Sequence, residues 1–144
     1  MIIGIGMDLV EIARIQRAYE RTSIPFIKRI LTNKEMKNFD ALETEKRKIE
    51  WVSGRLAAKE AFVKAIGKGF GDGLKCHDIE IVSTSEGRPA FRLSDRLRAD
   101  YEANTIFHLS ITHTAQQASA FVIAEEIKSA ECCKDAGEVF SYEK

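Results

Sequence analysis

The sequence lacks an apolar run of membrane-spanning length, and it lacks an excess of either charge. Its 22 basic and 22 acidic residues balance, so overall charge gives no case for a nucleic-acid partner. We expect no membrane association, because a spanning helix needs about 20 apolar residues in succession. The amino-terminal Met-Ile-Ile-Gly-Ile-Gly also lacks the basic start of a secretory signal.

Cysteine is scarce, with three residues in the chain. An odd number, two of them adjacent at Cys132 and Cys133, is a poor basis for disulfide pairing, so a reduced, cytoplasmic location is the simplest interpretation. A zinc site would need a fourth ligand and regular spacing, and we do not expect one. The 144 residues contain no internal repeat or low-complexity stretch, and this length predicts one domain.

Hydrophobic periodicity predicts an α+β fold, with a mainly antiparallel sheet packed on a long central helix. Residues 2–10 are apolar and β-branched enough for a buried strand, and a helix follows from Glu11. Pro25 suits the first turn of a short helix, and Thr32 with Glu35 predicts a capping box that opens another. The remaining expected elements are a long helix over 45–66, strands over 79–83, 89–93, 106–111 and 119–124, and a helix over 94–104.

Glycine marks the end of the long helix, where Gly67 is a plausible cap and further glycines continue a loop. After about Lys128 the chain turns polar without clear periodicity. We therefore expect a domain over 1–127 and a loose extension over 128–144, to which we assign no function.

Two carboxylates stand out, and each has an ordinary interpretation. Asp8 ends an apolar run and could cap the next helix. Glu60 lies four residues before Lys64 on the long helix, the spacing of a surface ion pair. Mg²⁺, however, commonly takes one or two protein carboxylates, so Asp8 and Glu60 would suit it if the fold brings them together. Basic residues beside a glycine-rich loop suit a pyrophosphate: Arg55, Lys59, Lys64 and Lys68.

Two further patterns also leave alternatives open. Arg14, Arg17 and Arg21 form a basic stripe on one helix, which is either a solvated face or a surface for an acidic partner helix. His113 ends the strand-like Ser-Ile-Thr-His stretch and is either structural or at the edge of a site.

Three segments in this order resemble the bacterial holo-[acyl-carrier-protein] synthase family, the small single-domain type of 4′-phosphopantetheinyl transferase. They are Gly-Ile-Gly-Met-Asp at 4–8, Gly-Arg-Leu-Ala-Ala-Lys-Glu-Ala-Phe-Val-Lys-Ala at 54–65, and Ser-Ile-Thr-His-Thr at 110–114. The resemblance covers roughly residues 1–127, although Met7 replaces a different apolar residue that is common in the family. It implies the 4′-phosphopantetheinyl transferase fold.

The resemblance also implies an activity: transfer of 4′-phosphopantetheine from coenzyme A to a serine of apo acyl carrier protein, releasing adenosine 3′,5′-bisphosphate. It implies a role in fatty acid biosynthesis, dependence on Mg²⁺ with Mn²⁺ as a substitute, and homotrimers with active sites at subunit interfaces. The serine proton would pass to Glu60 or to a water on the metal, and we favour the water because a carboxylate engaged with Mg²⁺ is a poor base.

By the same resemblance, Asp8 and Glu60 hold the metal, and Lys64 completes the catalytic group by neutralising phosphate charge. The implied coenzyme A-binding residues are Arg55, Lys64, Gly67, Gly87, Arg88, Pro89, Thr112 and His113, the last five from the neighbouring subunit. The implied carrier-binding residues are Arg14, Arg17 and Arg21.

Two other functions fit parts of the sequence. A Mg²⁺-dependent nucleotide pyrophosphatase would use the carboxylates and lysines, but it gives no reason for the arginine stripe. A non-catalytic binder of acidic helices explains the stripe but leaves Asp8, Glu60 and Lys64 without a role.

Overall fold

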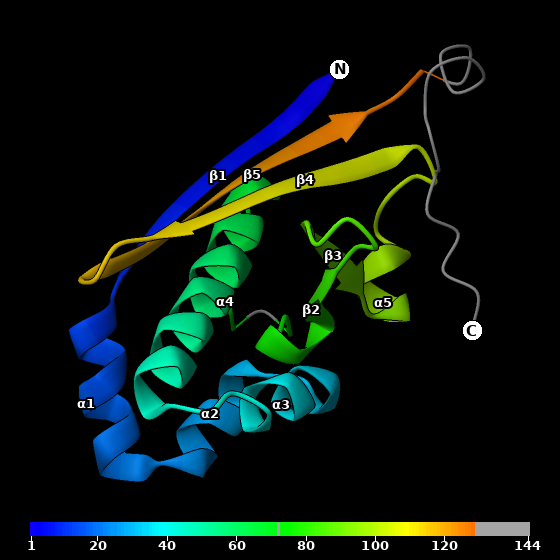
Figure 1. Ribbon diagram of the computed structural model, residues 1–144. Coiled ribbons are helices and arrows are strands. Elements are labelled where there is room, and N and C mark those ends of the chain that lie inside the picture. The colour runs from blue at the N-terminus through cyan, green and yellow to red at the C-terminus, as the bar shows by residue number, and fades with distance from the viewer. Residues whose placement is uncertain (72, 129–144) are drawn as a thin grey trace.

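A three-stranded antiparallel sheet lies across one long helix in the computed structural model, which describes residues 1–71 and 73–128 (Figure 1). The strand order is β1-β5-β4, and a separate hairpin pairs β2 with β3. The strands are β1 (Ile2–Glu11), β2 (Ile79–Ser83), β3 (Pro89–Leu93), β4 (Thr105–His113) and β5 (Gln117–Glu126). The helices are α1 (Ile12–Thr22), α2 (Ile24–Ile30), α3 (Asn33–Asp40), α4 (Glu45–Ala65), the 3₁₀ helix η1 (Cys76–Asp78) and α5 (Asp95–Arg98).

The predicted α+β architecture is confirmed, as are its local signals. Thr32 and Glu35 form the capping box of α3, and Pro25 lies in the first turn of α2. Gly67 follows α4 with φ +67°, the left-handed conformation that glycine adopts without strain. The predicted extension over 128–144 lies outside the described residues, apart from Lys128.

The helix predicted over 94–104 is much shorter, since α5 ends at Arg98. The Arg98 guanidinium donates hydrogen bonds to the carbonyl oxygens of Glu102, Ala103 and Thr105. These bonds hold residues 102–105 in a non-helical turn that leads into β4.

The core forms around α4, which packs on β1 and β5 and also contacts the hairpin. Its carboxyl-terminal half is buried on most sides, including Ala57, Ala61, Phe62 and Val63. Phe62 packs against Phe91 of β3, with ring centroids 4.9 Å apart. Within the described ranges, no helix is long and apolar enough to cross a bilayer. The position of α4 therefore sets the positions of the elements around it.

The strand β1, predicted to be buried, is covered on one face only. Val10 and Gly6 are buried on the α4 side, but alternate side chains on the other side are 46–62% exposed. Because the strand is apolar on both faces, its sequence reads as fully buried. We call the uncovered side of the sheet the outer face; its exposed apolar residues include Ile3, Ile5, Met7, Leu9, Ile106 and Phe121.

Glycine lets β1 approach the helix backbone closely. A Cβ atom on Gly4 would lie 1.9 Å from the Ala65 carbonyl oxygen, and one on Gly6 would lie 1.9 Å from the Ala61 carbonyl oxygen. Neither position has room for a side chain, because the obstructing atoms belong to the backbone of α4. These two glycines therefore fix how near the strand and the helix can lie.

The Gly6→Ala variant should consequently separate β1 from α4 and destabilise the protein by about 3 kcal/mol, the upper range for overpacking a core. Urea unfolding measures this loss. The control is Gly69→Ala, where a Cβ atom would meet nothing within 4 Å. Equal unfolding free energies for the two variants would contradict the close approach.

Candidate active site

The crossing of β1 over α4 brings Asp8 to Lys64. The Lys64 ammonium donates to Asp8 Oδ1 at 2.7 Å and to the Met7 carbonyl oxygen at 3.1 Å. Asp8 lies within β1 and does not cap α1, whose N-cap is Glu11, without a side-chain cap. The ordinary interpretation of Asp8 as a helix cap is therefore wrong, and the ion pair of Lys64 is with Asp8.

Glu60 belongs to the same cluster by its electrostatics. Burial, and then the negative charge of Asp8, raise the pKa of Glu60 above its usual value, while Lys64 and Arg14 oppose that rise. The hydrogen bond and the charge of Asp8 raise the pKa of Lys64. Two carboxylates that repel each other beside one lysine are incompletely neutralised, so a further cation would be favourable there.

This donor set suits Mg²⁺ better than zinc. Among the residues that the structure describes, no three His, Cys, Asp or Glu side chains gather to hold a metal. Structural zinc sites use four such ligands and catalytic ones three. Mg²⁺ keeps several waters and needs only one or two carboxylates, and Asp8 with Glu60 provides that number.

A cationic groove adjoins this cluster. The predicted stripe of Arg14, Arg17 and Arg21 lines a cavity of about 760 Å³, together with Phe26 and other residues. Several residues outside the predicted stripe also line it, among them the basic Arg29 of α2, the acidic Glu20 of α1 and the apolar Leu56 of α4. Leu56 lies one helical turn before Glu60 and so on the same side of α4. We call this cavity the arginine groove; Arg14 in its lining is close enough to Glu60 for its charge to oppose the rise in the pKa of that carboxyl.

Arg55 lies elsewhere, in a cavity of about 610 Å³ between α3, α4 and β2. Its guanidinium stacks on the Trp51 ring, 4.2 Å from the ring centroid, and its buried Nε has no hydrogen-bond partner. Burial lowers the pKa of Arg55, and Glu35 opposes that shift. Val82 and Ser83 also line this cavity, so Arg55 faces the hairpin and not Asp8.

The other residues predicted to bind coenzyme A lie on the hairpin and on β4. Gly87 and Arg88 occupy the turn between β2 and β3, where Gly87 has φ +79° and Arg88 pairs with Glu86 at 3.2 Å. Pro89 begins β3, and β4 ends with the exposed pair Thr112 and His113.

The predicted residues thus form two groups within one chain. Asp8 lies on β1 and Thr112 on β4, which are opposite edges of the three-stranded sheet with β5 between them. The hairpin packs near β4, whereas Glu60 and Lys64 lie near β1. We call these groups the β1 half-site and the β4 half-site; a single chain does not bring them together.

Two lysines predicted beside the phosphate are otherwise engaged. Lys59 is fully buried and bonded to Glu35 at 2.7 Å, so it cannot reach a ligand. Lys68 pairs with Asp100 at 3.1 Å. Of the lysines named from the sequence in this region, Lys64 is the one that the structure brings to the carboxylates.

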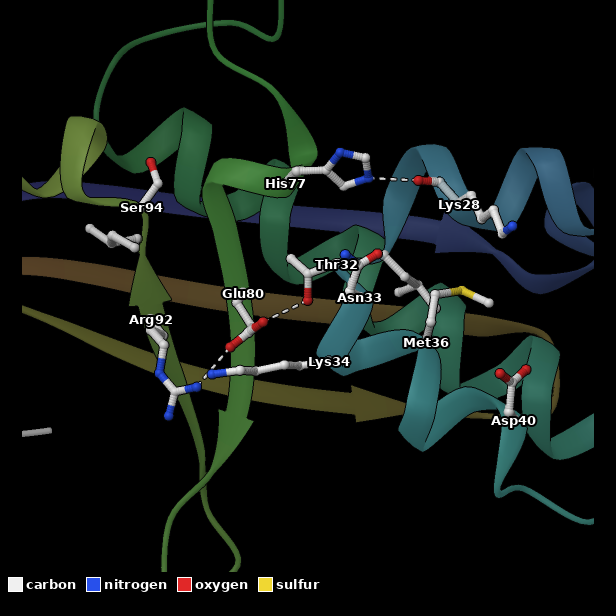
Figure 2. Close-up of a pocket in the computed structure, with 12 residues that line it drawn as sticks. Lys28, Thr32, Asn33, Lys34, Met36, Asp40, His77, Glu80, Arg92 and Ser94 are labelled. Atoms are coloured by element: carbon white, nitrogen blue, oxygen red, sulfur yellow. Dashed lines mark hydrogen bonds and ion pairs between the residues drawn. The ribbon is translucent and has the colours of Figure 1, made fainter. Parts of the chain in front are cut away.

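A third cavity, of about 710 Å³, contains none of the predicted site residues. Figure 2 shows Glu80 at its wall between Thr32 and Arg92, with oxygen-to-donor distances of 2.6 and 2.9 Å. This cavity could not be predicted from the sequence, because its lining comes from segments far apart in the chain.

Comparison with known proteins agrees with this geometry. Residues 4–124 match the model of the 4′-phosphopantetheinyl transferase superfamily. The holo-[acyl-carrier-protein] synthase of Staphylococcus haemolyticus is 43% identical over 126 residues, 88% of this chain and 98% of that protein. The enzyme of that name from Listeria innocua is 44% identical over 126 residues, covering 88% of this chain and 100% of its own length.

Solved structures give the same result. A crystal structure of a holo-(acyl-carrier-protein) synthase from Bacillus anthracis, in complex with CoA (3′,5′-ADP), matches with a TM-score of 0.74 and 37% identity. It covers 88% of this chain and 99% of its own. The resemblance seen in the sequence is confirmed: the chain belongs to the 4′-phosphopantetheinyl transferase superfamily, within its holo-[acyl-carrier-protein] synthase family.

Proposed function

We propose that this chain transfers 4′-phosphopantetheine from coenzyme A to a serine of an apo acyl carrier protein and releases adenosine 3′,5′-bisphosphate. The observation that carries the proposal is that the cluster of Asp8, Glu60 and Lys64 lies one turn of α4 from Leu56 in the wall of the arginine groove. A pyrophosphatase would not need the arginine groove, and a non-catalytic binding protein would not need two repelling carboxylates, Asp8 and Glu60. The family membership points to the same reaction.

Asp8 and Glu60 are the residues that would hold Mg²⁺, or Mn²⁺ in its place. When bound, the ion stabilises negative charge on the pyrophosphate and on the departing bisphosphate. The Lys64 side chain is 55% exposed although Asp8 holds its ammonium. It can therefore contact a phosphate oxygen while keeping its position, which favours in-line attack by the serine hydroxyl.

The arginine groove would receive the carrier protein. Its guanidinium groups suit an acidic helix, and Phe26 with Leu56 offers apolar contact between the charges. Since Leu56 lies one turn from Glu60, a carrier bound in the groove can present its serine to the β1 half-site.

We further propose that the chain works as a homotrimer whose sites combine the β1 half-site of one subunit with the β4 half-site of another. The separation of the half-sites at opposite sheet edges supports this arrangement. So does the outer face, where Met7 is 62% and Phe121 41% exposed, since exposed apolar patches mark interfaces. Gly67, just after the carboxyl end of α4, would then contact the same coenzyme A, whereas Arg55 faces the hairpin of its own chain and would lie outside that site. Fatty acid biosynthesis and a cytoplasmic location complete the proposal.

Transfer itself is tested by incubating the chain with coenzyme A, Mg²⁺ and apo carrier protein and weighing the carrier by mass spectrometry. We expect one added phosphopantetheine per carrier. Asp8→Asn and Lys64→Met should each reduce the rate by about 10²–10³, as the loss of one electrostatic group in an active site does. Lys46→Met is the control, since Lys46 is a 79% exposed lysine in the first turn of α4.

Each alternative gives a different result in this assay. Coenzyme A hydrolysis without carrier modification would favour a pyrophosphatase. Unmodified carrier that binds in an Arg14-dependent way would favour a binding protein.

Glu60→Gln should raise the unfolding temperature at pH 7 without Mg²⁺, while abolishing transfer. The folded-state pKa of Glu60 lies above its unfolded value, so ionisation destabilises the fold as pH rises through that range. Glutamine mimics the protonated form, and its advantage should disappear below about pH 4, where the unfolded glutamate is protonated too. Calorimetry across pH measures the difference, with Glu50→Gln on the same helix as control. A pH-independent difference would contradict the repulsion between the carboxylates.

Shared sites can be tested by mixing two inactive variants. Asp8→Asn removes the β1 half-site, and Arg88→Ala removes the β4 half-site through a 79% exposed side chain. Co-refolded one to one, random cyclic trimers should recover roughly a quarter of wild-type transfer, because one interface in four joins two intact halves.

Light scattering supplies the control for the mixture by measuring the size of each assembly. No recovery in correctly assembled mixtures would place both halves in one chain and refute the composite site.

A further inference from the structure

We propose that the buried ion pair of Lys59 and Glu35 is a positioning device that fixes the rotation of α4, so that Glu60 faces Asp8. The inference rests on the proposed role of Glu60, but it concerns residues that never touch a ligand. Lys59 directly precedes Glu60. Any rotation of α4 about its axis therefore moves both side chains by the same angle.

Lys59 is held at three points. Its Nζ donates to the Ile30 carbonyl oxygen at 2.6 Å, to Glu35 Oε2 at 2.7 Å and to the Cys76 carbonyl oxygen at 3.1 Å. An ammonium group has three N–H donors, so every one is satisfied. The side chain is 0% exposed, and no donor is left for a ligand.

Glu35 connects this anchor to two more segments. Its Oε2 also accepts from the Thr32 amide at 2.8 Å, and its Oε1 accepts from the Ile81 amide at 3.0 Å. The carboxylate is thus bonded to the start of α3 and to β2, and the ammonium to the end of α2 and to η1. Through this pair, one lysine of α4 is tied to α2, α3, η1 and β2.

On the opposite side of α4, the hydrogen bonds to β1 come from the Lys64 side chain, which is 55% exposed and belongs to the site itself. There the helix meets β1 at Gly4 and Gly6, through Ala61 and Ala65. Such contacts permit a close approach but are non-directional, whereas hydrogen bonds weaken steeply when bent. A buried ion pair adds little net stability over a well-packed apolar pair, and fixing register is its best-attested use.

The experiment separates position from stability by comparing Lys59→Met with the double variant Lys59→Met/Glu35→Leu. The single variant leaves a buried carboxylate unpaired and should lower the unfolding temperature strongly. The double variant removes both charges and should recover part of that temperature, because the backbone groups that Glu35 and Lys59 had bonded stay unpaired. Two readouts follow: the rise in unfolding temperature on adding Mg²⁺, and the Mg²⁺ concentration that gives half-maximal transfer.

We expect the double variant to be stable but to need about 10-fold or more Mg²⁺ for both responses, as when groups that orient metal ligands are lost. Ser53→Ala is the matched control: Ser53 is also buried on α4, but it bonds only to Ile49 of its own helix. Glu35→Gln, which keeps the shape of the carboxylate, should also raise the Mg²⁺ requirement.

A stable double variant with wild-type Mg²⁺ dependence would show a purely structural pair and overturn the proposal. If the double variant does not fold, the Glu35→Gln variant decides: a Mg²⁺ dependence equal to that of the wild type would overturn the proposal. The proposal would also be overturned if Mg²⁺ did not change the unfolding temperature of the wild-type protein. If Mg²⁺ raises the unfolding temperature of the wild-type protein but no phosphopantetheine is transferred, the proposed function is refuted. The effect of Mg²⁺ on the unfolding temperature of the variants would still test the role of Lys59 and Glu35.

Discussion

The close approach of β1 to α4 is the constraint on which the rest of the structure depends. Two residues of a strand advance about 6.6 Å, and four residues of a helix advance about 6 Å. Gly4 and Gly6 therefore match Ala65 and Ala61 at successive turns of the helix. The next residue on the same strand face is Asp8, one step further toward the amino end of α4, and the long Lys64 side chain reaches back to it at 2.7 Å. The spacing of the two glycines thus places the Asp8 carboxylate within reach of Lys64.

The same sheet divides its remaining tasks between its faces and edges. Its inner face covers α4, while its outer face exposes apolar side chains such as Ile5 and Met7. Its two edge strands carry the predicted site residues, with Asp8 on β1 and His113 on β4. An apolar face and two separated half-sites are independent features of the sheet. The proposed assembly would account for both, since a second copy of the chain would cover the face and supply the other half-site.

Much of this could be predicted from the sequence, because short-range rules govern the elements. The capping box at Thr32 and the helix end at Gly67 follow from local chemistry. The exposed face of β1 could not, since apolar residues on both faces of a strand look alike whether covered or not. Nor could the burial of Lys59, which depends on an acid 24 positions away. From the sequence, Lys59 is predicted to belong to a basic phosphate site, and only the fold shows that it is paired with Glu35.

Adjacent residues of α4 show how one helix treats charge in two ways. At Lys59 the charge is buried and fully paired, so it is fixed in position and chemically inert. At Glu60 the charge is half-buried beside another carboxylate, with a raised pKa that records incomplete compensation. A cation is bound most favourably where negative charge is incompletely neutralised, as at Glu60 and Asp8. Its ligands are positioned most accurately when the helix that carries them cannot rotate. The two pairs are therefore complementary: the neutralised pair of Lys59 and Glu35 would fix the helix, and the incompletely neutralised pair of Glu60 and Asp8 depends on that fixed position.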